Sequence, residues 1–353
     1  MKSTRKKRKM IPNKRKMKKP KYIKEKPPSL DPMNSKHPSV TKNRYTVRSY
    51  EQCHDKFLTY DQIKEFLIKM ATKYPSKIEL QVIGNSTEGR PIYLVIISDD
   101  SSDDTKLATL IEAGSNGCDW MAISTALFLI DFLTKNNSLS KIMDYFILPC
   151  SNPDAYHKTM NITNSSNPNI LMNIANNFPV TLGLFSTKFI QTEDFLKAIK
   201  LWKENFQYKL PETMALLKVI ANYQFAVKLL ISLQENGEQI VYPFGICREE
   251  VFDAEDLKKI AKSGQMMIKR RCFQVGSIYQ LCGLTFGSLV DYLKIRQTSI
   301  KFTYILHLGN KKGDADPKNI LSCGEDILNC IKIMAKNVYM FYHKSDKMNT
   351  NNE

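Results

Sequence analysis

The loop Ser115-Asn116-Gly117-Cys118-Asp119-Trp120 carries side chains that could take part in metal chemistry. It follows an apolar, strand-like run and precedes a long amphipathic segment. Asp119 offers a carboxylate, which is an accepted zinc ligand, whereas Asn116 offers a neutral amide oxygen, a poor donor for Zn²⁺ compared with imidazole. The loop has the form of a metal site without its usual ligands.

Polar residues also stand at two other strand ends. Gln234 and Glu235 follow the apolar run 227–233, and His307 lies within the run 302–308. A histidine is a competent general base near neutral pH, although a lone histidine at a strand end is more often a hydrogen-bonded structural residue.

The elements that would position these residues are strands alternating with helices. Apolar runs predict strands, which we list as 78–82, 92–98, 107–113, 144–150, 227–233 and 302–308. Helical spacing and capping signals predict helices, which we list as 59–74, 120–134, 192–208, a helix starting at Pro211, 254–270 and 325–342. This alternation predicts an α/β fold with one domain, residues 57–345, in which helices cover both faces of a mixed twisted sheet.

The charge of the chain is concentrated in a tail. The formal net charge is +17, but residues 1–26 hold 14 Lys or Arg and one acid and so account for +13 of it. Like-charge repulsion and few apolar residues predict that the tail, residues 1–56, is disordered, as is the end 346–353. The basic run could bind a nuclear-import receptor or nucleic acid, or it could be only a solvated extension.

The sequence gives less direct indications of the cellular location of the protein and of the redox state of its cysteines. No secretory signal follows the first charges, which favours a nuclear or cytoplasmic protein, with secretion as the alternative if the true start is missing. The most apolar stretch, 120–133, is too short to span a membrane. Eight cysteines without a zinc-type spacing favour reduced thiols, although up to four disulfides would be possible in a secreted protein.

Two motifs connect these elements to a known family. The turn Gly84-Asn85-Ser86-Thr87-Glu88-Gly89-Arg90-Pro91 and the segment Asn152-Pro153-Asp154-Ala155-Tyr156 occur in the expected order around the loop at Asn116. From about Phe57 to Tyr342 the sequence resembles the zinc metallocarboxypeptidases of the A/B type. The resemblance implies that family's fold and peptide hydrolysis as the ancestral activity.

The resemblance also implies roles for single positions. The three zinc-ligand positions correspond to Asn116, Asp119 and Gln234, and the general-base position corresponds to His307. Glu235 and Cys118 flank ligand positions and would be packing or rim residues. One carboxylate and two amides suit a hard cation better than zinc, and even then only weakly.

The positions that the resemblance implies for substrate binding have also lost their usual side chains. The positions of the family's three substrate-binding arginines correspond to Asn164, Asn167 and Asn176, all neutral, while Tyr279 matches the mobile tyrosine that closes over substrate. The helix expected at 192–208 replaces a glycine- and serine-rich loop of the family and would either pack on the sheet or cover the cleft.

Together these features predict a carboxypeptidase-like pseudoenzyme that binds a peptide or protein partner and needs no cofactor. The alternative is an active carboxypeptidase that holds zinc or another metal through Asp119 with Glu235 or Cys118 and uses His307 as base. The sequence leaves the oligomeric state open.

Overall fold

A computed structural model of the chain describes residues 54–99, 106–161, 173–180, 192–207, 209–309 and 315–350. These residues belong to the unit Arg48–Glu353. The basic segment 1–26 and the positions Asn164 and Asn167 lie outside the described residues.

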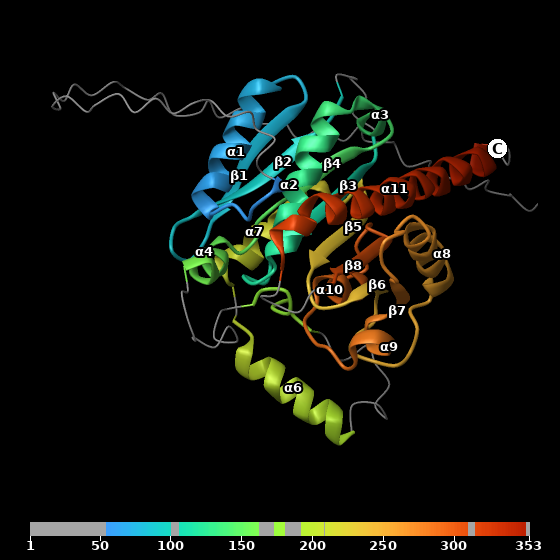
Figure 1. The fold of residues 1–353 in the computed structure, drawn as a ribbon. Coiled ribbons are helices and arrows are strands. Elements are labelled where there is room, and N and C mark those ends of the chain that lie inside the picture. Colours follow the sequence, from blue (N-terminus) through green and yellow to red (C-terminus); the bar gives the residue numbers. More distant parts are fainter. Residues whose placement is uncertain are drawn as a thin grey trace, which may run out of the picture. The chain divides into compact units, whose positions relative to one another are not determined.

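A mixed sheet of eight strands forms the centre of this unit, in the order β1-β2-β4-β3-β5-β8-β6-β7 (Figure 1). The strands are β1 (Ile78–Asn85), β2 (Pro91–Ile97), β3 (Ala108–Ala113), β4 (Asp144–Leu148), β5 (Val227–Gln234), β6 (Glu238–Tyr242), β7 (Gln274–Ser277) and β8 (Phe302–Leu308). Strands β4, β3, β5 and β8 run parallel to one another, whereas β2 pairs antiparallel with β4 and β6 pairs antiparallel with β8. The predicted α/β fold with a mixed sheet is confirmed.

Helices cover both faces of the sheet because successive residues of its buried strands point to opposite sides. On one face, Ile111 and Ile231 pack in a cluster with α1 (Tyr60–Lys73), α2 (Trp120–Lys135), α8 (Ala254–Gln265) and α11 (Ile320–Thr350). On the other face, Leu110 and Leu230 pack with α7 (Pro211–Tyr223), α9 (Ile278–Cys282) and α10 (Leu289–Ile295). Figure 1 shows α2 and α11 crossing the first of these faces.

The shorter elements complete the fold. They are α3 (Asn137–Ser140), α4 (Pro153–Asn161), α6 (Glu193–Asn205) and the 3-10 turn η4 (Pro317–Asn319). A third, smaller apolar cluster holds α6, which stands beyond the carboxyl ends of the parallel strands (Figure 1).

Most predicted elements occur within a few residues of their expected bounds. The predicted capping box at the start of α1 is present, with the Thr59 side chain accepting from the Gln62 backbone and the Gln62 side chain accepting from the Thr59 backbone. Helix α8 ends at Gln265, five residues earlier than expected, and α11 begins at Ile320 and continues to Thr350. The described helices include none that is both long and apolar enough to cross a membrane.

Candidate functional site

The candidate residues from three strands meet at one edge of the sheet. Strands β3, β5 and β8 are parallel neighbours, so their carboxyl ends lie together, which is where α/β folds place their sites. In the pairing register Ala113 lies opposite Leu233, and Gln234 lies opposite His307. The structure therefore places the loop after β3, the end of β5 and the end of β8 at the same edge of the sheet.

Close packing fixes the loop after β3. Gly114 has φ +75°, and a Cβ at Gly117 would lie 2.5 Å from the backbone carbon of Ala155 at the start of α4. The Thr159 hydroxyl donates to the Gly117 carbonyl at 2.6 Å and accepts from the Trp120 indole nitrogen at 3.0 Å. The loop thus keeps a defined shape although its side chains are not those of a zinc site.

The two candidate ligands in this loop are both buried. Asn116 is 9% exposed, and Asp119 is fully buried at the N-cap of α2, where its side chain makes no capping hydrogen bond. The backbone nitrogen of Asp119 donates to the carbonyl of Asn116 at 3.0 Å, and the nitrogen of Ile123 donates to the carbonyl of Asp119 at 3.1 Å. The backbone of both residues is thus part of the turn that starts α2.

Gln234 belongs to a buried hydrogen-bond chain that runs beneath the site. Its amide nitrogen donates to the Ser232 hydroxyl at 3.1 Å, and that hydroxyl donates to the Glu112 carboxyl at 2.7 Å. The Ser151 hydroxyl donates to the other oxygen of Glu112. Burial raises the pKa of Glu112, while hydrogen bonds from serines, including Ser115, oppose that rise. The Gln234 side chain is thereby tied to the body of the sheet.

Glu235 and Cys118, which flank the ligand positions, are buried at 2% and 7% exposure. One carboxylate oxygen of Glu235 accepts a hydrogen bond from the backbone nitrogen of Met121 in the first turn of α2. A carboxylate at this place stabilises a helix N-terminus, whose backbone donors have no partner within the helix. Glu235 therefore has a structural contact that explains its position without a metal.

The donor set does not fit a zinc ion. Asn116, Asp119 and Gln234 supply one carboxylate and two amides, and the amide of Gln234 is engaged with Ser232. Among the described residues, no three or more His, Cys, Asp or Glu side chains form a group that could hold a metal ion. His307 is half-buried on β8, beside Gln234 and Gln239 on the neighbouring strands. We therefore derive no metal-assisted step for this site.

Tyr279 is joined to an arginine that the sequence patterns did not single out. Arg248 donates from Nε to the Tyr279 hydroxyl at 2.8 Å, and its guanidinium lies 5.6 Å from the centre of the tyrosine ring. The hydrogen bond with Tyr279 is the main cause of a raised Arg248 pKa. The backbone nitrogen of Tyr279 donates to the carbonyl of Phe244 at 2.9 Å. The tyrosine is thus connected at both its backbone and its hydroxyl to the segment 244–248.

Asn176 is the only one of the three positions predicted to bind substrate that the structure describes; it is exposed and lies under α6. Its backbone carbonyl accepts a hydrogen bond from the Trp202 indole nitrogen at 3.0 Å. A Cβ at Gly287 would lie 2.2 Å from that nitrogen and 2.3 Å from the Asn176 carbonyl oxygen. The contact of α6 with this segment therefore requires glycine at position 287.

Helix α6 is the predicted replacement for a loop, and it packs through an apolar stripe. Phe195 and Ile199 are buried at 2% and 7% exposure against residues that include Ile246 and Phe286. The rings of Phe195 and Phe286 meet edge to face with centroids 5.0 Å apart. The helix covers the segments that flank Tyr279 and Asn176.

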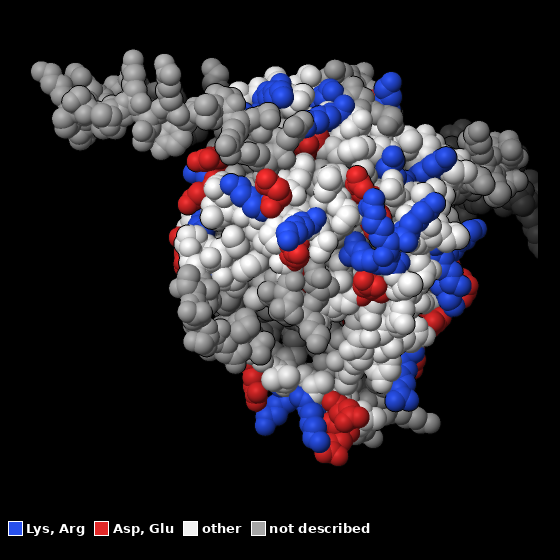
Figure 2. Space-filling view, in the orientation of Figure 1, with Lys and Arg blue, Asp and Glu red and all other residues white. Residues whose placement is uncertain are grey.

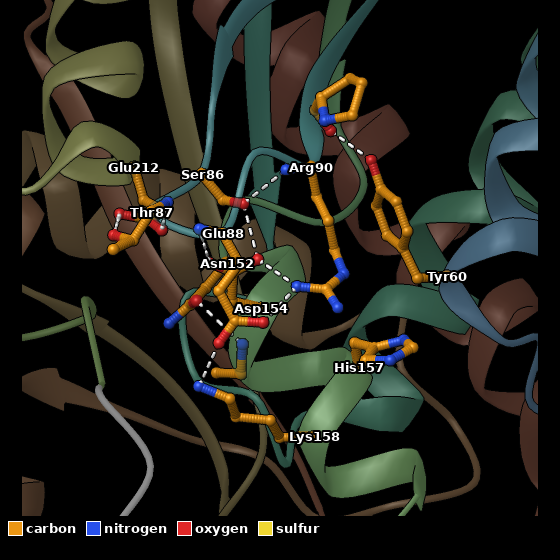
Figure 3. A network of polar contacts seen from close by, with 12 residues as sticks. Tyr60, Ser86, Thr87, Glu88, Arg90, Asn152, Asp154, His157, Lys158 and Glu212 are labelled. Carbon is orange, nitrogen blue, oxygen red and sulfur yellow. Dashed lines mark hydrogen bonds and ion pairs between the residues drawn. The ribbon is translucent and has the colours of Figure 1, made fainter.

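The two motifs that carry the family resemblance are joined by a polar network (Figure 3). The Asp154 carboxylate accepts from the Ser86 hydroxyl at 2.6 Å, from the Glu88 backbone nitrogen at 2.7 Å and from Arg90 at 2.7 Å. Lys158 and Arg90 lower the pKa of Glu88 to about 2. These contacts hold the turn 84–91 against α4, which in turn supports the loop at Gly117.

Comparisons with known proteins agree with this architecture. The sequence profile of the zinc carboxypeptidase family matches residues 63–342, so the chain belongs to that family. Carboxypeptidase A1 of Mus musculus is 22% identical over 270 residues, which cover 70% of this chain and 62% of the mouse protein. Mast cell carboxypeptidase A of Homo sapiens is 23% identical over 318 residues, which cover 82% and 72% of the two chains.

Solved structures show the same fold. Bovine thrombin-activatable fibrinolysis inhibitor, in a complex with tick carboxypeptidase inhibitor, has a TM-score of 0.67 at 20% identity and covers 81% of this chain and 98% of its own. Carboxypeptidase A from Helicoverpa armigera has a TM-score of 0.66 at 21% identity and covers 81% and 75%.

Proposed function

We propose that this chain is a catalytically inactive member of the zinc carboxypeptidase family that binds a peptide or protein partner at the former substrate cleft. The observation that carries the proposal is the donor set at the strand edge. Asn116, Asp119 and Gln234 stand at the three ligand positions, and two neutral amides cannot replace two imidazoles as zinc ligands of ordinary affinity.

The hydrogen bonds around this site hold its loops in a defined shape, which supports a binding role. The loop at Gly117 is held by Thr159 and Trp120, and the network around Asp154 connects the two family motifs. The close approach at Gly117 keeps the loop in one conformation, so the side chains at this edge of the sheet have fixed positions against which a partner can bind.

Substrate recognition differs from that of the family. With Asn176, Asn164 and Asn167 neutral, a free C-terminal carboxylate has no guanidinium fork at those positions. Arg248 is a cation that instead lies beside Tyr279. A partner would therefore be selected through Tyr279, Arg248 and the surface of α6 more than through its C-terminus.

A peptidase and metal assay of the full-length chain tests the proposal. We expect no release of C-terminal residues from peptides ending in phenylalanine or lysine, with or without added zinc, and no stoichiometric metal in the purified protein. Release that a chelator abolishes, together with one bound metal per chain, would establish the alternative, an active enzyme with atypical ligands such as Asp119 with Glu235 and His307 as base.

The basic segment carries a separate proposal about location and partners. Residues 1–26 would direct the protein to the nucleus through an import receptor or bind nucleic acid, because their charge of +13 greatly exceeds the +4 of the remaining chain. On the face of the described domain that Figure 2 draws, basic and acidic side chains are interspersed. Deletion of residues 1–26 should abolish nuclear accumulation, and unchanged localisation would refute this role.

A further inference from the structure

A cavity of about 310 Å³ lies between the end of β8, the start of β6 and the first turns of α11. Its charged and polar lining consists of Glu238, Arg270, Arg271, Asn319, Ser322 and Asp326. None of these residues is a candidate ligand, base or substrate position of the strand-edge site. The volume is at the lower end of the range for small-molecule pockets.

The charges on the cavity wall restrict the class of ligand. Two guanidinium groups, Arg270 and Arg271, face the same space as two carboxylates, Glu238 and Asp326. An anion in the cavity would lie near the two carboxylates, and a cation would lie near the two guanidiniums. In both cases, repulsion by the like charges and the cost of desolvation would weaken binding. A small molecule that carries both charges matches the wall.

Asp326 supplies the most specific observation. The residue is 4% exposed, and its Oδ2 atom accepts no hydrogen bond from any residue that the structure describes. Its contacts with the arginines are long, 3.4 Å from Oδ1 to Arg270 and 3.9 Å from Oδ2 to Arg271 Nε. Close charge-assisted hydrogen bonds are about 2.7–2.9 Å. Less than 1 Å² of Oδ2 is exposed, so a ligand ammonium group would approach Asp326 on the side of Oδ1, where the contact with Arg270 is 3.4 Å long.

The arginines are held in place by the protein and keep donors for a ligand. Arg271 donates to the carbonyl of Leu308 and to the thiol of Cys323, and Arg270 donates to the carbonyl of Ser322 and to Glu325. A guanidinium has five N–H donors, and these contacts leave some of them without an acceptor among the described residues. Two fixed guanidiniums with remaining donors form a carboxylate site.

We propose that this cavity binds a free α-amino acid, with the ligand carboxylate toward Arg270 and Arg271 and the ligand ammonium toward Asp326 and Glu238. The proposal does not depend on the proposed function, because it uses none of the residues at the strand edge. The cavity nevertheless borders that edge, since Leu308 follows His307 on β8 and Arg271 donates to the Leu308 carbonyl.

Calorimetric titration of the full-length chain with each of the twenty L-amino acids tests this site. We expect at least one to bind with a dissociation constant of about 1 mM or lower, as a ligand of this size permits. The amide and the N-acetyl derivative of that amino acid, which each lack one of the two charges, should bind at least about tenfold more weakly. If no amino acid binds, or if either derivative binds equally well, the proposal is wrong.

Two substitutions with matched controls connect binding to the cavity. Glu238→Gln removes a charge from a half-buried side chain and Arg270→Gln removes one from an exposed side chain; each should weaken binding at least about tenfold. Glu255→Gln on α8 and Arg296→Gln at the end of α10 change the same residue types outside the cavity and should leave binding unchanged. Unchanged binding in both cavity variants, or equal loss in the controls, would contradict this location.

Discussion

Removal of the Phe195 side chain should detach α6 from the rest of the domain. Phe195 is 2% exposed, and its ring meets Phe286 edge to face at a centroid distance of 5.0 Å. Truncating a buried phenylalanine to alanine costs about 3–5 kcal/mol, and the ring pair adds about 1 kcal/mol to what the buried area provides. We use about 3 kcal/mol for Phe195→Ala because α6 is peripheral and its neighbours can relax.

This loss should appear locally, because the third apolar cluster is separate from the two that hold the sheet. Since about 1.4 kcal/mol corresponds to tenfold, amide hydrogen exchange in α6 should become faster by about two orders of magnitude. Exchange in α2, which is buried in the main cluster, should stay the same. Emission from Trp202, whose indole donates to Asn176, should shift to longer wavelength.

Leu196→Ala is the matched control because Leu196 is adjacent on α6 but 54% exposed. We expect it to change the free energy of docking by about 0.5 kcal/mol or less. Equal acceleration of α6 exchange in both variants would refute the packing described for this helix. Unchanged hydrogen exchange of α6 in Phe195→Ala would also refute this packing.

Three further substitutions test the scaffold. Gly117→Ala should lower the free energy of unfolding by at least about 2 kcal/mol in urea titrations, because its Cβ would lie 2.5 Å from the Ala155 backbone, and a wild-type midpoint would show that the loop is not packed so closely. Arg90→Ala should cost about 3 kcal/mol in the same assay because it leaves the buried Asp154 carboxylate without its cation, and a loss below about 1 kcal/mol would make this an ordinary surface pair. Burial raises the pKa of the Asp291 carboxyl from 3.8 to about 7. Between these two values the folded state holds a proton that the unfolded state releases, so the free energy of unfolding should fall as the pH rises from about 4 to about 7. Asp291→Asn should reduce that fall, and an unchanged pH profile would contradict the raised pKa of Asp291.

The sequence was sufficient for the long elements of the fold because their apolar periodicity is strong. The runs that became β3, β5 and β8 are almost wholly apolar, as strands buried on both faces are. Strands β6 and β7 were not predicted because their short sequences, EQIVY and QVGS, show neither a long apolar run nor a regular alternation of apolar and polar residues. Helix α4 was read only as part of the Asn-Pro-Asp motif, although Pro153 stands at its first position.

The residues of the candidate site could be predicted from the sequence only where they stand in or next to a recognisable motif. The motifs predicted a grouping of Asn116, Gln234 and His307; in the sheet register Gln234 lies opposite His307, and Asn116 lies in the loop that follows the neighbouring strand β3. Arg248 was missed because nothing in its local sequence shows that its guanidinium lies on Tyr279, 31 residues away. Glu112 did give a signal, because a carboxylate inside an apolar strand must find buried partners, which are serines from separate segments.

Zinc binding by a reverted site is the decisive measurement for the loss of the metal from this chain. The triple variant Asn116→His, Asp119→Glu and Gln234→His introduces the ligand types of the family in the loop after β3 and at the end of the neighbouring strand β5. A scattered control, Asn136→His, Asp61→Glu and Asn205→His, introduces the same two histidines and one glutamate at exposed positions on three separate helices or helix ends.

We measure zinc binding by competition with a fluorescent chelator and by metal analysis after dialysis. We expect one zinc ion per chain for the folded triple variant and none for the wild-type chain or the scattered control. Stoichiometric zinc in the wild-type chain would contradict the claim that the site has lost its metal. A folded triple variant without zinc would show that the three positions do not converge.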